Sequence, residues 1–222
     1  QGAINYVNWE TIGFLLGMFL LIAILSEAGF FRWIALILAR KLDYEPLKIL
    51  IFFPLLAFGL AAFIDSITVM LFLSAVTFEL SKLLKFDPGP VIISEVVLAN
   101  IGGAATLVGD PPNVILGTVL GFGFNDFVMH NGPIALAAAL GAVAVNYLLN
   151  RKGFSRSRSV LNLKALKAVD PRSQLKDRYL LKCGLIGMAV ALIFLIGKPF
   201  FDRLGWPMPV STASLLPAFL IL

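Results

Sequence analysis

NIGGAATLVGDPPN, residues 100–113, lies inside an apolar stretch that is long enough to cross a bilayer. A proline removes a helical hydrogen bond and clashes with the preceding turn, and Pro111 and Pro112 follow each other here. Asp110 precedes a proline, which pushes its backbone out of the α region. Backbone groups freed within hydrocarbon are tolerated only where protein or a water-filled cavity satisfies them. The stretch therefore predicts two half-helices that meet at an unwound polar segment able to bind a solute.

The composition is that of an integral membrane protein. Of the 222 residues, 59% are hydrophobic and 14% are charged, and the mean hydropathy is +0.92. A soluble domain carries roughly a quarter charged residues. The single cysteine, Cys183, excludes an intramolecular disulfide. The sequence has no Walker-type loop and no metal-ligand spacing, and its one histidine is His130, so we predict no enzymatic activity and no cofactor.

Positive charge is concentrated in one segment. Residues 150–182 hold ten lysines and arginines against two aspartates, Asp170 and Asp177. Because apolar runs flank this segment and no recognition motif accompanies it, we predict no binding of nucleic acid. The positive-inside rule instead predicts a cytoplasmic loop in a multi-pass protein of the plasma membrane, in contact with membrane lipids.

The order of apolar runs and breaks predicts an all-α integral membrane fold. A first repeat would occupy residues 1–149, with a span over 9–28, an interfacial helix over 29–41, a re-entrant hairpin over 47–85, the broken span over 89–124 and a span over 132–149. Residues 125–133 are expected to form an external loop. A basic linker over 150–179 and the start of a second repeat over 180–222 follow. Since the chain ends within an apolar run, we expect a longer protein.

The hairpin has an alternative reading. Two full spans joined at Asp65-Ser66 would also place the basic residues at both outer ends on one side. Two spans need about 20 residues each and an exposed turn, however. Phe63, Ile64 and Ile67 surround the turn, which favours a re-entrant hairpin whose tip, 65–68, stops near the midplane.

Both the tip and the break carry groups that could bind ions. The unpaired carbonyls of a half-helix end suit a hard cation, and the N–H groups after Pro111 suit an anion. Asp110 could couple proton or sodium movement or cap the helix that follows. Glu79 is expected to pair with Lys82, and the role of Glu95 stays open between structure and transport.

These residues carry a family resemblance. EVVLANIGGAAT at 95–106, followed by GDPPN at 109–113, resembles the signature of the ion transporter superfamily. Within it the pattern is similar to the arsenite permease and melanosomal P protein branch, which is related to the divalent anion:sodium symporters. AFIDSIT at 62–68 and NWET at 8–11, followed by Gly17-Met18, resemble the same branch. The resemblance covers essentially the whole chain.

The resemblance implies an inverted-repeat secondary transporter with a re-entrant helical hairpin and a broken transmembrane helix in each repeat. It also implies a homodimer with elevator-type motion. Sodium would bind between the hairpin tip and the break, at Ser66, Thr68, Asn100, Gly102 and Gly103. The complete set of implied ion- and substrate-binding residues adds Asp65, Thr106, Asp110 and Asn113. This sequence has Ser66 where related tips carry asparagine, which changes the oxygen and nitrogen atoms offered to an ion.

The leading functional prediction is an ion-coupled secondary active transporter of a small inorganic or organic anion, or an oxyanion-like solute. The coupling ion would be sodium or a proton. A sodium/proton antiporter that uses Asp65 and Asp110 is one alternative. An anion channel-like conductance through the same break is another. Saturable, gradient-dependent uptake would distinguish a carrier from a channel.

Overall fold

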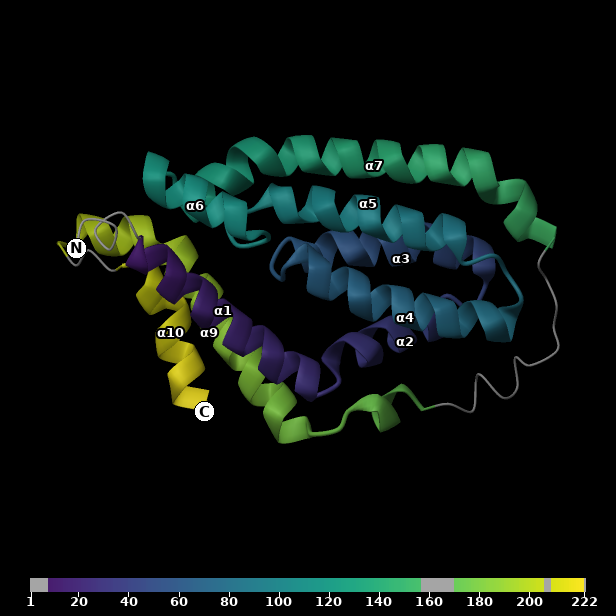
Figure 1. The fold of residues 1–222 in the computed structure, drawn as a ribbon, viewed down its shortest axis with the longest axis horizontal. Helices are drawn as coiled ribbons and strands as arrows, with labels where there is room; N and C mark the ends of the chain where they lie inside the picture. Colours follow the sequence, from purple (N-terminus) through teal and green to yellow (C-terminus); the bar gives the residue numbers. More distant parts are fainter. Residues whose placement is uncertain (1–7, 157–169, 206–208, 222) are drawn as a thin grey trace, which may run out of the picture.

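The computed structural model describes residues 8–156, 170–205 and 209–221. Within these ranges the chain is almost entirely helical and contains no strand. Figure 1 shows two groups of helices, with α3, α4, α5 and α7 on one side and α1, α9 and α10 on the other. The predicted all-α fold is confirmed at this level.

The first helix, α1 (Trp9–Glu27), begins and ends where its local sequence dictates. The Asn8 side chain accepts a hydrogen bond from the Thr11 backbone N–H at 3.0 Å and so caps the helix. Gly29 has a φ of 82°, a left-handed conformation that turns the chain after α1. The shorter helix α2 (Phe30–Lys41) follows directly.

The hairpin consists of α3 (Pro46–Ala61) and α4 (Ser66–Leu84), which run antiparallel in Figure 1. Only four residues, 62–65, connect the two helices. Asp65 caps α4, because its Oδ1 accepts a hydrogen bond from the Thr68 N–H at 2.8 Å. The tip is therefore a tight, self-capped turn.

The predicted break separates α5 (Gly89–Ala105) from α6 (Pro111–Leu120). Thr106 and Asp110 both have extended backbone conformations, with φ/ψ of −130°/168° and −135°/145°. Pro111 occupies the first position of α6, where its missing N–H costs nothing. Gly121, with a φ of 74°, ends α6.

The helix α7 (Phe124–Arg156) corrects one prediction. We expected an external loop over 125–133, but helix begins at Phe124 and continues through Pro133. Asp126 accepts a hydrogen bond from the Gly123 N–H at 2.7 Å, which secures the start of the helix. His130 bonds to the Asp126 carbonyl oxygen at 2.8 Å. The polar residues at 125–131 thus belong to the first turns of a helix of 33 residues.

The second group contains α9 (Arg178–Arg203) and α10 (Val210–Ile221), both of which pack against α1. A short 3-10 helix, η2 (Pro171–Gln174), precedes α9 and lies against α2. Asp177 caps α9 through hydrogen bonds from the N–H groups of Tyr179 and Leu180. Residues 157–169 of the predicted basic linker lie outside the described residues, as do 206–208.

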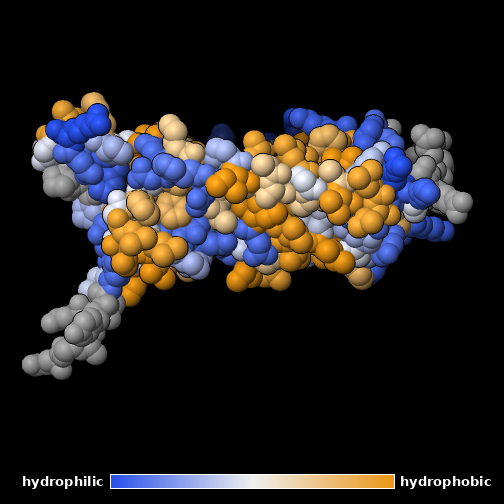
Figure 2. All heavy atoms as spheres, turned by 90° about the horizontal axis from the view of Figure 1, so that it is seen from above, coloured by the Kyte–Doolittle hydropathy of each residue, from blue (hydrophilic) through white to orange (hydrophobic). Residues whose placement is uncertain are grey.

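The surface of the described chain is rich in apolar side chains. Four of its helices, α1, α4, α7 and α9, are long and apolar enough to cross a membrane. Figure 2 shows hydrophobic residues over much of the middle of one face and hydrophilic residues gathered at its ends. This distribution is that of an integral membrane protein, whose outer surface faces lipid tails.

Candidate functional site

A direct side-chain link joins the hairpin tip to the break. Asp110 Oδ1 accepts two hydrogen bonds from Ser66, one from the hydroxyl at 2.8 Å and one from the backbone N–H at 3.2 Å. Ser66 is buried, and Asp110 is half-buried. Because Ser66 is the first residue of α4, the Asp110 carboxylate occupies the anion position at a helix N-terminus.

The unwound segment is held by hydrogen bonds to its own ends and to the tip. Asn113 donates two hydrogen bonds from Nδ2, to the carbonyl oxygens of Gly103 and Thr106, both at 2.8 Å. These carbonyl groups lie at the C-terminal end of α5, where no N–H group of the same helix is available to donate to them. The Thr106 hydroxyl donates to the Ala62 carbonyl oxygen in the tip, and it accepts from the Val108 N–H at 3.2 Å.

Three glycines let the break approach its neighbours closely. A Cβ on Gly102 would overlap the backbone of Phe58 in α3, and one on Gly103 would overlap the Asp110 carboxylate. A Cβ on Gly109 would overlap the carbonyl oxygens of Gly103 and Ala61. Small residues of this kind allow membrane helices to pack backbone against backbone.

The structure gathers most of the predicted site residues but not all. The group that converges at the tip and break contains Asp65, Ser66, Thr68, Gly102, Gly103, Thr106, Asp110 and Asn113. Asn100 lies on an exposed side of α5, and its amide donates to the Val96 carbonyl oxygen of its own helix at 2.8 Å. In this conformation Asn100 is not linked to the tip, and its role as a ligand stays a prediction.

The chemistry of this group suits a hard monovalent cation better than a tightly coordinated transition metal. The tip and break offer carboxylate, hydroxyl and carbonyl oxygens, which sodium and other hard cations prefer. The described residues contain no cluster of three or more His, Cys, Asp and Glu side chains that could hold a metal ion. Asp110 bonds to Ser66, whereas the Asp65 carboxylate bonds to the Thr68 N–H.

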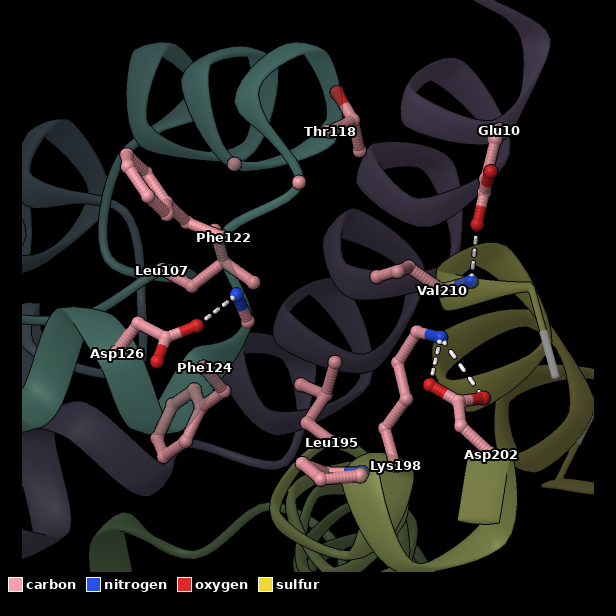
Figure 3. Close-up of a pocket in the computed structure, with 14 residues that line it drawn as sticks. Glu10, Leu107, Thr118, Phe122, Phe124, Asp126, Leu195, Lys198, Asp202 and Val210 are labelled. Atoms are coloured by element: carbon pink, nitrogen blue, oxygen red, sulfur yellow. Dashed lines mark hydrogen bonds and ion pairs between the residues drawn. The ribbon is translucent and has the colours of Figure 1, made fainter. Parts of the chain in front are cut away.

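A pocket that the sequence did not reveal reaches the break from another direction. It has a volume of about 350 Å³ and lies between α6, α1, α9 and α10 (Figure 3). Leu107, which belongs to the unwound segment, lines it together with polar residues from four helices: Glu10, Thr118, Asp126, Lys198 and Asp202. Lys198 pairs with Asp202 at 2.9 Å. Of these polar residues, only Lys198 and Asp202 have a sequence spacing, i,i+4, that indicates a contact.

The predicted pairing of Glu79 with Lys82 is wrong. Glu79 on α4 instead forms a bidentate contact with Arg32 on α2, with oxygen–nitrogen distances of 2.8 and 3.0 Å. The Lys82 ammonium lies 4.5 Å from the centre of the Phe78 ring. Local spacing suggested the i,i+3 partner, whereas the packing of α2 against α4 supplies a better one.

The Asn113 amide gives a direct test of how the break is held. Asn113→Ala removes the donor to two carbonyl oxygens, and each buried acceptor left without a partner costs about 1–3 kcal/mol. We expect a lower unfolding temperature in detergent and reduced uptake after reconstitution. Ser74→Ala is the control, because the Ser74 hydroxyl bonds only to the Met70 and Leu71 carbonyl oxygens of its own helix. Equal unfolding temperatures for the two variants would contradict the account.

A helix interrupted by a polar segment, tied to a hairpin tip and surrounded by apolar spans, defines a membrane transport protein. The chain belongs to the citrate transporter family CitMHS, and the match covers residues 1–220. This finding confirms the resemblance to the ion transporter superfamily that residues 95–113 indicated.

Individual relatives agree with this assignment. The chain is 34% identical over 190 residues to the "46 kDa membrane protein" of Mycobacterium leprae, which covers 85% of this chain and 44% of that protein. It is 32% identical over 192 residues to an "uncharacterized transporter" of Mycobacterium tuberculosis, with 85% and 44% covered. It is 43% identical over 113 residues to the "P protein" of Homo sapiens, with 51% and 14% covered. The chain thus spans less than half the length of these relatives, and no solved structure matches it.

Proposed function

We propose that this chain forms the first repeat, and the start of the second, of an ion-coupled secondary active transporter for a small anion or an oxyanion-like solute. The observation that carries the proposal is the pair of hydrogen bonds from Ser66 to Asp110, which joins the hairpin tip to the unwound segment. A bound ion that replaced or joined these contacts would change how the tip sits against the break. Ion binding would thereby be coupled to the conformation of the solute site.

The coupling ion in this proposal binds between the tip and the break. Asp65 and Asp110 supply the negative charge, and Ser66, Thr68 and nearby carbonyls supply neutral oxygens. The Ser66 side chain is shorter than the asparagine side chain that related tips carry, so its oxygen lies closer to the backbone. Sodium at Ser66, Thr68, Asn100, Gly102 and Gly103 therefore requires a rearrangement that brings Asn100 toward the tip.

The proposed substrate class is a small carboxylate or oxyanion. Support comes from the family description, which names citrate, and from the N-terminus of α6 at the break, where helix N–H groups favour an anion. The pocket in Figure 3 provides a way for a solute to reach Leu107 in the unwound segment. Arsenite and other oxyanion-like solutes remain within this class.

The proposal also covers the architecture of the whole carrier. The relatives are more than twice as long as their matched regions, which leaves room for an inverted second repeat beginning with α9 and α10. We propose a homodimer in the plasma membrane, with the basic segment 150–182 in the cytoplasm and elevator-type motion. The hairpin α3–α4 would be re-entrant, and the 16-residue length of α3 supports this reading.

A sodium/proton antiporter is the second candidate function. Two carboxylates at the tip and the break, Asp65 bonded to the Thr68 N–H and Asp110 bonded to Ser66, could exchange the two cations without an organic substrate. Such an antiporter would move sodium against a pH gradient in the absence of any anion.

Flux into liposomes that contain the full-length protein separates these functions. Citrate, dicarboxylates, arsenite, chloride and sodium are each tested under separate pH and sodium gradients. The proposal predicts saturable uptake of one anion that depends on a cation gradient. Sodium flux without an anion requirement would favour the antiporter. Currents that neither saturate nor need a coupling gradient would establish a channel and overturn the proposal.

A further inference from the structure

A pocket between α2 and the segment that precedes α9 is separate from the tip, the break and the pocket of Figure 3. Its volume is about 430 Å³, and we call it the α2–η2 pocket. Its lining comes from α2 and from the start of η2, and includes Trp33, Ile37, Arg40, Lys41, Asp170 and Arg172. None of these residues belongs to the sites described above.

Direct contacts between the two segments build this pocket. The Lys176 N–H donates to the Ala28 carbonyl oxygen at 3.1 Å, just before α2 begins. A Cβ on Gly29 would overlap the carbonyl oxygen of Gln174, so the two backbones lie against each other at this point. The packing of η2 on α2 thus places Arg172 in the same pocket as residues that are far from it in the sequence.

The charge in the α2–η2 pocket is unbalanced. Arg40, Lys41 and Arg172 are exposed, and none of them forms an ion pair with a described side chain. Asp170 supplies the one carboxylate in the described lining, and its Oδ1 accepts a hydrogen bond from the Arg172 N–H at 3.0 Å. A cleft lined mainly by one sign of charge attracts counter-ions. The pocket therefore favours an anion.

Three other cations on the same or neighbouring segments differ in this respect. Each has a carboxylate partner within 3.3 Å, and the pairs are Arg32 with Glu79, Lys48 with Glu45, and Lys176 with Glu27. The α2–η2 pocket thus gathers positive side chains that the described chain does not pair.

The dipole of α2 explains only part of this arrangement. Arg40 and Lys41 lie in the last turn of α2, where a helix favours positive charge. Arg172 belongs to another segment, and its approach adds a like charge, which costs free energy unless an anion offsets it. The convergence of two segments on one pocket is the observation that carries the inference.

The pocket also has an apolar side, at the end of a candidate membrane span. Trp33 and Ile37 are half-buried and line the pocket one turn apart on α2. Lys41 follows Ile37 after one further turn, so the three residues lie on one face of the helix. The span α1 ends at Glu27, just before α2 begins. This places α2 at the level of lipid headgroups, where tryptophan is enriched.

We propose that the α2–η2 pocket binds the headgroup of an anionic phospholipid. Arg40 and Arg172 hold the phosphate, because the fork of a guanidinium group matches two phosphate oxygens. Lys41 adds a third positive charge, and the side chains of Trp33 and Ile37 cover the start of the acyl chains. Basic pockets beside membrane helices recognise anionic headgroups in this way. The inference concerns lipid binding and does not depend on the proposed transport function.

Binding of phosphatidylglycerol to the delipidated full-length protein, measured by native mass spectrometry at fixed ionic strength, tests the proposal. Wild type is expected to bind one phosphatidylglycerol more tightly than phosphatidylcholine with the same acyl chains. Each arginine beside an anionic lipid contributes about fivefold in affinity, so Arg40→Gln/Arg172→Gln should weaken this binding by about 25-fold. Phosphatidylglycerol should also raise the unfolding temperature of wild type more than that of the double variant.

Arg151→Gln/Lys152→Gln is the matched control, because it removes two positive charges from exposed positions on α7 that do not line the pocket. It should keep the wild-type affinity for phosphatidylglycerol. Both double variants should unfold at the wild-type temperature without lipid, since all four side chains are exposed. Equal affinity of wild type for the two lipids, or equal losses in the two double variants, overturns the proposal.

Inorganic phosphate and Trp33→Ala separate a lipid ligand from a soluble anion. Trp33→Ala is expected to weaken the binding of phosphatidylglycerol, because the indole covers the start of the acyl chains. Inorganic phosphate is expected to displace little of the bound lipid. If inorganic phosphate binds to wild type as tightly as phosphatidylglycerol, the pocket is a site for a soluble phosphate, and the assignment to a lipid is wrong.

Discussion

Replacing Asp110 with asparagine is expected to abolish ion-coupled uptake by the full-length protein while leaving membrane insertion intact. Asparagine retains the oxygen that accepts from Ser66, so the link between tip and break persists. Only the negative charge is lost. A unit charge roughly 4 Å from a cation contributes about 4 kcal/mol at an effective dielectric constant of about 20, which corresponds to ion binding weaker by about three orders of magnitude.

The measurement for this variant is uptake into liposomes, paired with binding of the coupling ion to the purified protein. Asp87→Asn is the matched control, because Asp87 is exposed just before α5, where it accepts a hydrogen bond from the Gly89 N–H at 3.0 Å, away from the tip and the break. Normal gradient-driven uptake in Asp110→Asn would refute the assignment of this carboxylate.

Ser66→Ala extends the same test. If Asp110 and Ser66 act as one unit, the double variant should lose less ion binding than the sum of the two single losses, and the difference is the coupling energy. Independent, additive losses would mean that the link between tip and break has no part in ion binding.

Gly102→Ala is expected to have the largest effect on stability. The added Cβ would overlap the backbone of Phe58, which cannot rotate away as a side chain would. The helices α3 and α5 must then separate, and overpacking of this kind costs about 1–3 kcal/mol or more. We expect a lower unfolding temperature and little uptake, measured by thermal unfolding in detergent and by liposome flux.

Gly59→Ala on α3 is the control for this change. A Cβ there meets nothing within 4 Å, and alanine favours a helix by about 0.5–1 kcal/mol relative to glycine. Its unfolding temperature should stay the same or rise. A Gly102→Ala protein as stable as Gly59→Ala would show that α3 and α5 do not pack backbone against backbone.

The position of the break could be predicted from sequence because its causes are local. Pro111 and Pro112 interrupt the helix whatever surrounds them, and Asp110 is constrained by the proline that follows it. The cause of the tip is local in the same sense, because the Asp65 side chain caps α4 by accepting a hydrogen bond from the N–H of Thr68, three residues later. The two predicted segments, 65–68 and 100–113, are in contact in the structure.

The partners within the site could not be predicted, because packing chooses among several donors and acceptors. Nothing in the sequence indicates that Asn113 donates to both Gly103 and Thr106, or that Asn100 bonds within α5. The loop predicted over 125–133 failed for a related reason. Polar residues in this pattern are typical of a solvent-exposed loop. In the structure, Asp126 and His130 instead form hydrogen bonds at the start of α7.

We propose that the tip, 62–68, and the break, 106–110, together bind the transported ion and solute. A cryo-electron microscopy map of the full-length protein in lipid nanodiscs, with citrate and sodium, tests it most directly. We predict helix that stops near Ala105 and resumes at Pro111, with ligand density between Asp110, Ser66 and the α6 N-terminus. Continuous helix from Gly89 through Leu120, or ligand density remote from both segments, would contradict the account.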